Sequence, residues 1–456
     1  MEEEKDITQQ SEVVEEEFLY LLDGYTLSYG YLLKGCKKPR KLYIHHVCLE
    51  NIPQVFNDTE TNILELFSSN LPEQEKKEEN ETEEEQKIMS PFKTRGILLL
   101  KLNSICRGNS PVQKETIQLL QKLYEEDILP IIPIKTRRSS SGNTYHISAV
   151  GRVLLGEGEV LYNNERKPTK EVFEQLQITP IHMKDPEYKV FIEGNEFNAM
   201  TIVEGYERIQ RCLQSLAVGV SLGLLAKGKI GKSIESSFFH QFTMKGVSRL
   251  VNLIKNYLPR GKQPEEEIKG VHPMNTDPLV VDFACSFGRI FEVLLFVKEM
   301  ISIELNGVRD NSFVVQRKED IGISEPSWGN GSHSGIIARE IVGVSKELIV
   351  LCKRYESLLS SPLEMNQTEQ KEKHQQEQLV GPFERSLEKV KPTLHQASEI
   401  IAKYLIQVKH LTFAEFPLES TKQLFEQFCA IEDEKMVDAL KFGDITRIIR
   451  ETHHDF

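Results

Sequence analysis

The sequence has few of the features that mark secreted or metal-binding proteins. It has a single tryptophan and seven cysteines, and no two cysteines are separated by only two residues. An odd, dispersed set of cysteines is typical of reduced thiols, and it indicates neither a disulfide framework nor a zinc site. We therefore expect a cytoplasmic protein without a bound metal.

Long uncharged apolar runs are absent as well. The most apolar long stretch, Leu279 to Ile303, contains charged residues throughout: Asp282, Arg289, Glu292, Lys298 and Glu299. That pattern predicts a buried amphipathic helix and excludes a membrane span. The amino-terminal stretch MEEEKDITQQSEVVEEE is acidic and has no apolar centre, which is not the pattern of a signal peptide.

Positive charge is in deficit, since the formal net charge is −13. This argues against nucleic acid as a partner, because phosphate backbones are bound by basic surfaces. The hydrophobic content of 39% and charged content of 27% are ordinary for a globular protein, and 456 residues can bury a sizeable core. We expect one large helical domain or two, without a membrane segment.

Composition divides the chain into three predicted parts. Residues 1–17 form a disordered acidic tail, because charge without apolar periodicity cannot bury enough surface to fold. Residues 18–190 form an amino-terminal region that starts with a small α/β cap and carries an acidic low-complexity loop at 71–87 and a polar loop at 136–151. Residues 191–456 form a bundle of long helices.

Apolar residues recur at helical spacing along most of the chain. The predicted fold class is therefore mostly α, with long antiparallel helices that cover one another's apolar stripes. The predicted helical segments are two helices between 88 and 129, broken at 108–111, then 200–225, 238–258, 279–305, 340–359 and 383–411, with a last helix starting near Ser420.

Segments spread over residues 20–340 match one enzyme family in order and approximate spacing. They are Leu21–Leu27 (LLDGYTL), Ile97–Val112 (ILLLKLNSICRGNSPV), Thr136–Gly151 (TRRSSSGNTYHISAVG), Gly156–Gly158 (GEG) and Ile303–Asn311 (IELNGVRDN). Together they resemble the aromatic amino acid ammonia-lyases, most closely histidine ammonia-lyase. The resemblance implies an ammonia-lyase-like helical fold and a homotetramer in which each active site draws residues from several subunits.

The loop centred on Ser140, Ser141 and Gly142 corresponds to the family's source of an electrophile. There, three consecutive residues cyclise to methylidene-imidazolone (MIO): the glycine nitrogen attacks the carbonyl two residues back, and loss of two waters leaves an exocyclic methylene. Ser141 can lose its hydroxyl, Gly142 lets the backbone fold back on itself, and Ser140 is small. The resemblance thus implies a self-derived MIO cofactor and conversion of L-histidine to urocanate and ammonia.

Serine and glycine also favour plain turns, and the surroundings of the loop depart from the family. The acidic run at 71–87 takes the place of a catalytic loop that carries a tyrosine base. Leu279 and Asp282 stand for the family's second tyrosine and for the arginine that grips the substrate carboxylate. A carboxylate in place of that arginine repels the substrate carboxylate. We therefore expect Ser140-Ser141-Gly142 to remain uncyclised.

Four further residues are predicted to contact a substrate. Glu193 stands where the family has an asparagine, His146 follows the loop, Asn306 lies in the ELN helix end, and His333 lies in a segment that resembles the family's GNFHGE. For His146, a buried structural histidine is the open alternative.

Residues 226–233 (AKGKIGKS) match the loose pattern of a phosphate-binding loop. Such a loop requires a preceding strand, so that backbone amides point at phosphate. Here a helical segment precedes it, and we interpret it as a basic turn between helices.

Two functions remain open from the sequence. The first is a histidine ammonia-lyase-like protein with impaired or lost activity. The second is a catalytically inactive relative that serves as a structural, ligand-binding or assembly protein.

Overall fold

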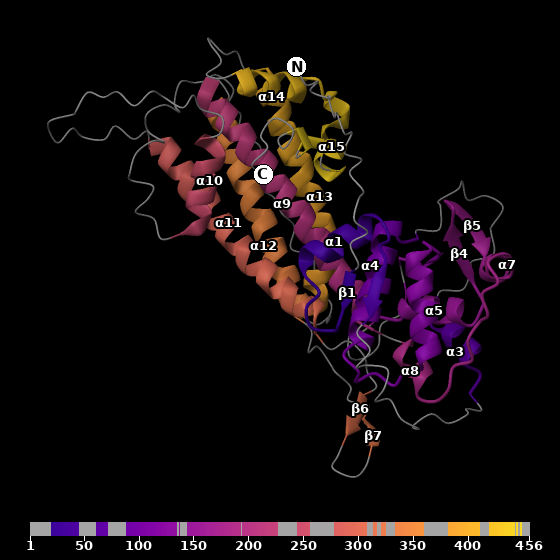
Figure 1. Cartoon of the computed structure of the whole chain (residues 1–456). Coiled ribbons are helices and arrows are strands. Elements are labelled where there is room, and N and C mark those ends of the chain that lie inside the picture. Colours follow the sequence, from indigo (N-terminus) through magenta and orange to yellow (C-terminus); the bar gives the residue numbers. More distant parts are fainter. Residues whose placement is uncertain are drawn as a thin grey trace, which may run out of the picture. The chain divides into compact units, whose positions relative to one another are not determined.

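The structure is a computed structural model of the chain. It describes residues 20–44, 61–71, 88–134, 136, 144–192, 194–226, 244–255, 278–307, 313–316, 321–324, 333–359, 382–410, 419–442, 444–445 and 447–448 (Figure 1). These residues belong to two compact units, one within 1–197 and 305–329 and the other within 198–304 and 330–456. The predicted acidic tail, residues 72–87 and the loop at 137–143 lie outside the described residues.

The first unit begins with a small α/β region, as predicted. Strands β1 (Tyr20–Leu22) and β2 (Leu42–Ile44) pair in parallel, and α1 (Tyr29–Lys37) connects them. Ser28 caps α1, since its side chain accepts a hydrogen bond from the backbone N–H of Tyr31. A short helix, α3 (Ile63–Ser69), follows.

Helix α4 (Pro91–Ile105) is the centre of the first unit, because every residue from Gly96 to Ile105 is buried. A helix that is buried on all sides needs neighbours on all sides. Ser90 caps it, and Pro91 takes the first helical position, where its missing N–H costs nothing. After the break at 108–111, α5 (Lys114–Glu125) buries one face. The predicted pair of helices is confirmed.

A three-stranded antiparallel sheet joins β3 (Leu129–Pro130), β4 (Glu159–Tyr162) and β5 (Glu165–Pro168). Asn163 and Asn164, both with positive φ, connect β4 to β5. Asparagine tolerates that conformation, which a two-residue hairpin turn requires. The unit also contains α6 (Ile147–Leu154), α7 (Thr169–Gln175), α8 (Glu187–Val190) and the antiparallel pair β6 (Phe313–Gln316) and β7 (Ile321–Ser324).

The second unit is helical. Its long elements are α9 (Glu196–Ala226), α11 (Pro278–Leu305), α12 (Ser334–Leu359) and α13 (Pro382–Lys409), and Figure 1 shows them lying alongside one another. Their contact is close: a Cβ added at Gly205 of α9 would lie 2.9 Å from Val390 and 3.5 Å from Ile341. Shorter elements are α10 (Lys245–Lys255), α14 (Glu419–Cys429), the 3-10 turn η3 (Asp433–Lys435) and α15 (Met436–Phe442).

The mostly helical fold class and the predicted long helices are confirmed. Because α9 extends to Ala226, a helix precedes the AKGKIGKS segment, whose residues 227–233 lie outside the described residues. Among the described helices, none is long and apolar enough to cross a membrane.

Candidate functional site

The predicted ring-forming residues Ser140, Ser141 and Gly142, and the predicted substrate residue Glu193, lie outside the described residues. The residues next to them do meet. Thr144 and Gly194 form an antiparallel bridge, with backbone hydrogen bonds of 3.2 Å and 3.0 Å between them. The structure therefore brings the carboxyl end of the loop against the segment that carries position 193, although about fifty residues separate them in sequence.

His146 is buried beside this bridge, with 4% of its surface exposed. Its Nε2 lies 3.1 Å from the carbonyl oxygen of Ile134, on the other side of the loop. The imidazole stacks on Phe197 with ring centroids 3.8 Å apart and an interplanar angle of 15°. The Lys93 ammonium covers the same phenyl ring at 4.0 Å. His146 thus connects both flanks of the loop to α4 and the start of α9.

A buried ion pair holds the segment around position 193 in place. Lys101 Nζ lies 2.9 Å from Glu196 Oε1, and the two side chains are 0% and 2% exposed. The ammonium also donates to the carbonyl oxygen of Val190 at 3.0 Å. Two charges in so dry a place are tolerated only when each neutralises the other. The pair therefore fixes the backbone on both sides of position 193.

Asn306 lies at a junction of three sequence segments. Its amide oxygen accepts from the backbone N–H of Leu27 at 3.0 Å, and its amide nitrogen donates to the carbonyl of Leu27 at 3.0 Å. Asn103 of α4 donates to the same amide oxygen at 3.2 Å and accepts from the Gly24 N–H at 3.1 Å. Arg107 donates to the Asn306 carbonyl and stacks over the Tyr25 ring. Through these bonds, Asn306 and Asn103 hold residues 24–27 against α4.

Glu304 and His333 meet at the start of α12 in the second unit. The buried Glu304 carboxylate accepts from the backbone N–H of His333 at 2.8 Å and from the Ser334 hydroxyl at 3.0 Å. A carboxylate at a helix N-terminus satisfies unpaired amides and complements the helix dipole. The His333 side chain is 42% exposed, with Nδ1 3.7 Å from Glu304.

Asp282, on α11, is engaged by two residues of α12. The Tyr355 hydroxyl donates to Asp282 Oδ2 at 3.1 Å, and Arg354 Nη1 lies 3.1 Å from the same oxygen. Burial, and then the negative charge of Asp282, raise the pKa of Tyr355 above its ordinary value, so its hydroxyl stays a donor at neutral pH.

Comparison with known proteins decides the family. A family model described as aromatic amino acid lyase matches residues 83–335, more than half of the chain. The chain belongs to the aromatic amino acid lyase family. Histidine ammonia-lyase from Alkaliphilus oremlandii is 24% identical over 267 residues, which cover 56% of this chain and 51% of that protein. The enzyme from Geobacillus sp. is 29% identical over 231 residues, 49% of this chain and 44% of that protein. The matches therefore span about half the length of these relatives.

Solved structures of the family share the fold over nearly the whole chain. Histidine ammonia-lyase from Trypanosoma cruzi aligns with a TM-score of 0.71 at 16% identity, covering 95% of this chain and 96% of that one. Phenylalanine aminomutase from Pantoea agglomerans aligns with a TM-score of 0.70 at 12% identity, covering 93% and 99%. The fold of this lyase-family chain is therefore an ammonia-lyase fold.

Sequence analysis did not predict the residues that contact the family motifs. Lys101 carried a signal, since it is the only charged residue in the apolar run from Ile97 to Leu102, and buried charges need partners. Its partner Glu196 had no such signal. Arg354 and Tyr355 occur in an ordinary amphipathic helix, and nothing local to them pointed to Asp282.

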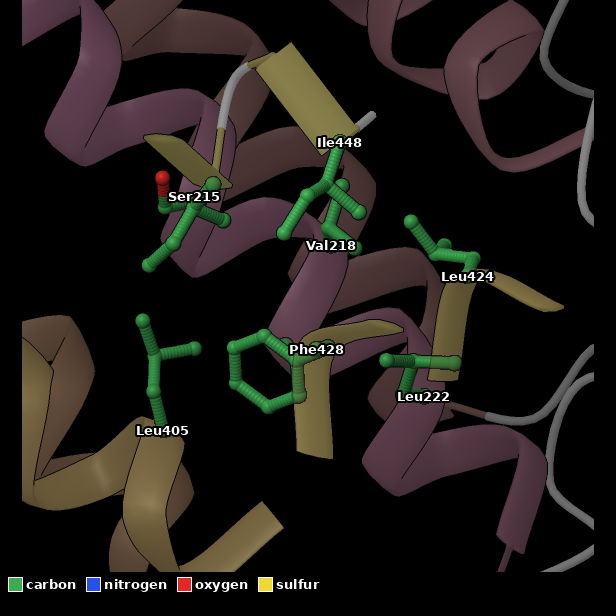
Figure 2. A pocket seen from close by; sticks show the side chains of 9 residues that line it. Ser215, Val218, Leu222, Leu405, Leu424, Phe428 and Ile448 are labelled. Carbon is green, nitrogen blue, oxygen red and sulfur yellow. The ribbon is translucent and has the colours of Figure 1, made fainter. Parts of the chain in front are cut away.

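The second unit contains a small cavity that is too small to bind a ligand (Figure 2). Its volume is about 10 Å³, at the lower limit for a single water molecule. It is lined by Ser215, Val218, Gly219, Leu222, Leu405, Leu424, Phe428, Ile445 and Ile448. Ser215 is the one hydroxyl-bearing residue among them, and an amino acid cannot enter. Among the described residues, no group of histidines, cysteines and carboxylates could hold a metal ion.

Proposed function

We propose that this lyase-family chain is a histidine ammonia-lyase-like protein in which ammonia elimination is impaired or lost. The observation that carries the proposal is Asp282. By resemblance it stands where the family has the arginine that holds the substrate carboxylate, and its own carboxylate is engaged by Arg354 and Tyr355. An ionised carboxylate only accepts hydrogen bonds, so Asp282 cannot donate to a substrate carboxylate as an arginine does. A lyase that cannot hold the amino-acid carboxylate loses the orientation on which its rate depends.

The residue types at positions 140–142 fit the MIO ring of the family. When formed, such a ring would supply an electrophile for the substrate amine. Thr144 and Gly194 would hold the loop against position 193, and His146 would fix the two loop flanks. By family resemblance, Glu193, His146, Asn306 and His333 remain proposed substrate residues. Asn306 makes internal bonds to Leu27, so the role we give it is support of the site.

The second candidate is an active histidine ammonia-lyase that converts L-histidine to urocanate and ammonia. The residue types at positions 140–142 favour it, because they are the ones that the ring requires. The Thr144–Gly194 bridge also holds the carboxyl end of this loop in place.

One measurement shows whether the loop carries the ring that an active enzyme needs. The accurate mass of the peptide from Ser139 to Arg152 is compared between the natural chain and Ser141→Ala. We expect an unmodified mass in both. A natural peptide lighter by two waters, with the loss absent in Ser141→Ala, would overturn the expectation and favour the active enzyme. Assays with histidine, phenylalanine and tyrosine would then identify the substrate.

We also propose a cytoplasmic homotetramer, on family resemblance, with a small amino acid as ligand if the site is active and neither nucleic acid nor membrane as partner. In an inactive relative, the same scaffold would serve a structural, ligand-binding or assembly role. Light scattering coupled to size-exclusion chromatography tests the tetramer, and a monomeric mass would remove the assembly role.

A further inference from the structure

The Asp282 cluster has a chemical character of its own. An arginine and a phenol hydroxyl from consecutive residues of α12, Arg354 and Tyr355, reach the same carboxylate oxygen on α11, each at 3.1 Å. Guanidinium groups and neutral hydroxyl donors are the side chains with which proteins recognise carboxylates. Here the carboxylate comes from the chain itself.

The donor arrangement is fixed by apolar packing. Tyr355 is only 2% exposed, and its ring packs edge-on against Phe283 at 5.8 Å and Phe287 at 6.0 Å between centroids. Such aromatic contacts restrict the ring, so the hydroxyl stays aimed at the position of the carboxylate. A pre-oriented donor loses little entropy when it binds a ligand.

Solvent also reaches this cluster. The side chains of Asp282 and Arg354 are 30% and 53% exposed. A small ion could therefore enter from water once the carboxylate of Asp282 is gone, without any opening of the helices.

We propose that Arg354 and Tyr355 form a carboxylate-binding site that Asp282 occupies as an internal ligand. Removal of the Asp282 carboxylate opens this site to a small free carboxylate such as formate. The inference rests on the same Asp282 contacts as the proposed function. Its test needs neither the MIO ring nor ammonia elimination, so failure of the one can be told from failure of the other.

The test is chemical rescue of Asp282→Ala, which deletes a group of the size of formate. Its melting temperature is measured in sodium formate and in sodium chloride at equal ionic strength, with formamide as the neutral analogue. Very small ligands bind weakly, with dissociation constants of millimolar order at best. At formate concentrations about ten times the dissociation constant, the folding equilibrium constant should rise about tenfold over that in chloride. The natural chain should show no such difference.

Matched variants assign the effect to the site. Asp444→Ala removes the carboxylate of an exposed pair with Arg447, in which the two side chains are 44% and 67% exposed. It should respond to formate no more than to chloride. The double variants Asp282→Ala/Arg354→Gln and Asp282→Ala/Tyr355→Phe should lose most of the formate response.

Three outcomes would overturn the proposal. They are equal melting temperatures of Asp282→Ala in formate and chloride, an equal rescue by formamide, and an unchanged response in the Arg354→Gln double variant. Should Asp282→Ala be unfolded in chloride, its refolding yield replaces the melting temperature. Refolding in formate alone supports the site, and failure in both salts, with Asp282→Asn folded, counts against it.

Discussion

This chain has two polar clusters that join segments distant in sequence. One is built from residues that match the family motifs, and the other from a residue that departs from them. In the first unit, Asn103 and Asn306 match the family segments LNS and ELN, and they bond mainly to backbone groups such as those of Leu27. In the second unit, Asp282 departs from the family at a position that resemblance assigns to substrate binding, and it bonds to the side chains of Arg354 and Tyr355.

The difference is between side chains that serve the fold and a side chain at a position that the family uses for a ligand. Where a side chain serves backbone groups in the interior, replacing it leaves buried donors and acceptors unpaired, which is costly whatever the protein does. Where a side chain serves a ligand, it can change as soon as a new internal partner satisfies it. The LNS and ELN motifs, whose contacts the structure describes, are ones that the fold itself needs.

The largest effect that can test this contrast is expected from the buried ion pair of the first unit. Lys101→Met leaves Glu196 charged and unpartnered in a dry interior, and should lower the free energy of unfolding by about 3–5 kcal/mol. Urea denaturation measures it. The double variant Lys101→Met/Glu196→Gln should recover part of the loss. A Lys101→Met variant as stable as the natural chain would show that this buried ion pair does not stabilise the first unit.

The next largest effect is expected at the Asn306 junction. Asn306→Ala leaves both backbone groups of Leu27 without their partner, and should cost about 3 kcal/mol, since each unsatisfied buried group costs about 1–3 kcal/mol. Thermal or urea unfolding gives the value. Asn62→Ala is the matched control: its side chain caps α3 locally, so its loss should cost only about 1 kcal/mol.

A smaller effect is expected in the second unit. Tyr355→Phe removes one hydrogen bond to the partly exposed Asp282 and should cost about 1 kcal/mol. Asp282 remains solvated and in contact with Arg354, which limits the loss. If urea unfolding gave a larger cost for Tyr355→Phe than for Asn306→Ala, the contrast between the two clusters would be reversed.

The smallest effect at neutral pH, and the most specific, is expected at Tyr206 of α9. Burial, with a smaller contribution from Glu207, raises the pKa of Tyr206 to about 12 from 10.0. Below pH 10 both the folded and the unfolded chain keep this proton. Between pH 10 and 12 the unfolded chain loses it first, so stability falls as pH rises. Stability of Tyr206→Phe, measured by urea unfolding through the alkaline range, should fall less steeply; an identical slope would contradict the assignment.

Much of the fold was predictable from sequence because its signal is local. The apolar repeat of residues 279–305 predicted α11 almost to its ends, and the break at 108–111 separated α4 from α5. The hairpin of β4 and β5 was missed, although Asn163 and Asn164 between two short strands carry a recognisable turn signal.

For the candidate site, the sequence predicted the motif positions but not the residues that hold them in place. The loop and position 193 were singled out, and the structure joins their neighbours Thr144 and Gly194. Their supports were not predictable, because Lys101 and Val190 are 89 residues apart, and periodicity says nothing about partners at that separation. Ser140, Ser141, Gly142 and Glu193 lie outside the described residues, so their roles stay predictions.

Glu187 has a consequence for the order of events during folding. Its buried carboxylate accepts from the Gln113 N–H at 2.9 Å and from the Thr116 hydroxyl at 2.5 Å, across 74 and 71 residues of chain, and so completes the first turn of α5. Such a cap forms only after the intervening hairpin and helices have brought the two segments together. Helix α5 should therefore gain its amino-terminal turn late. Glu187→Gln should accelerate unfolding far more than it slows folding, which stopped-flow measurements resolve.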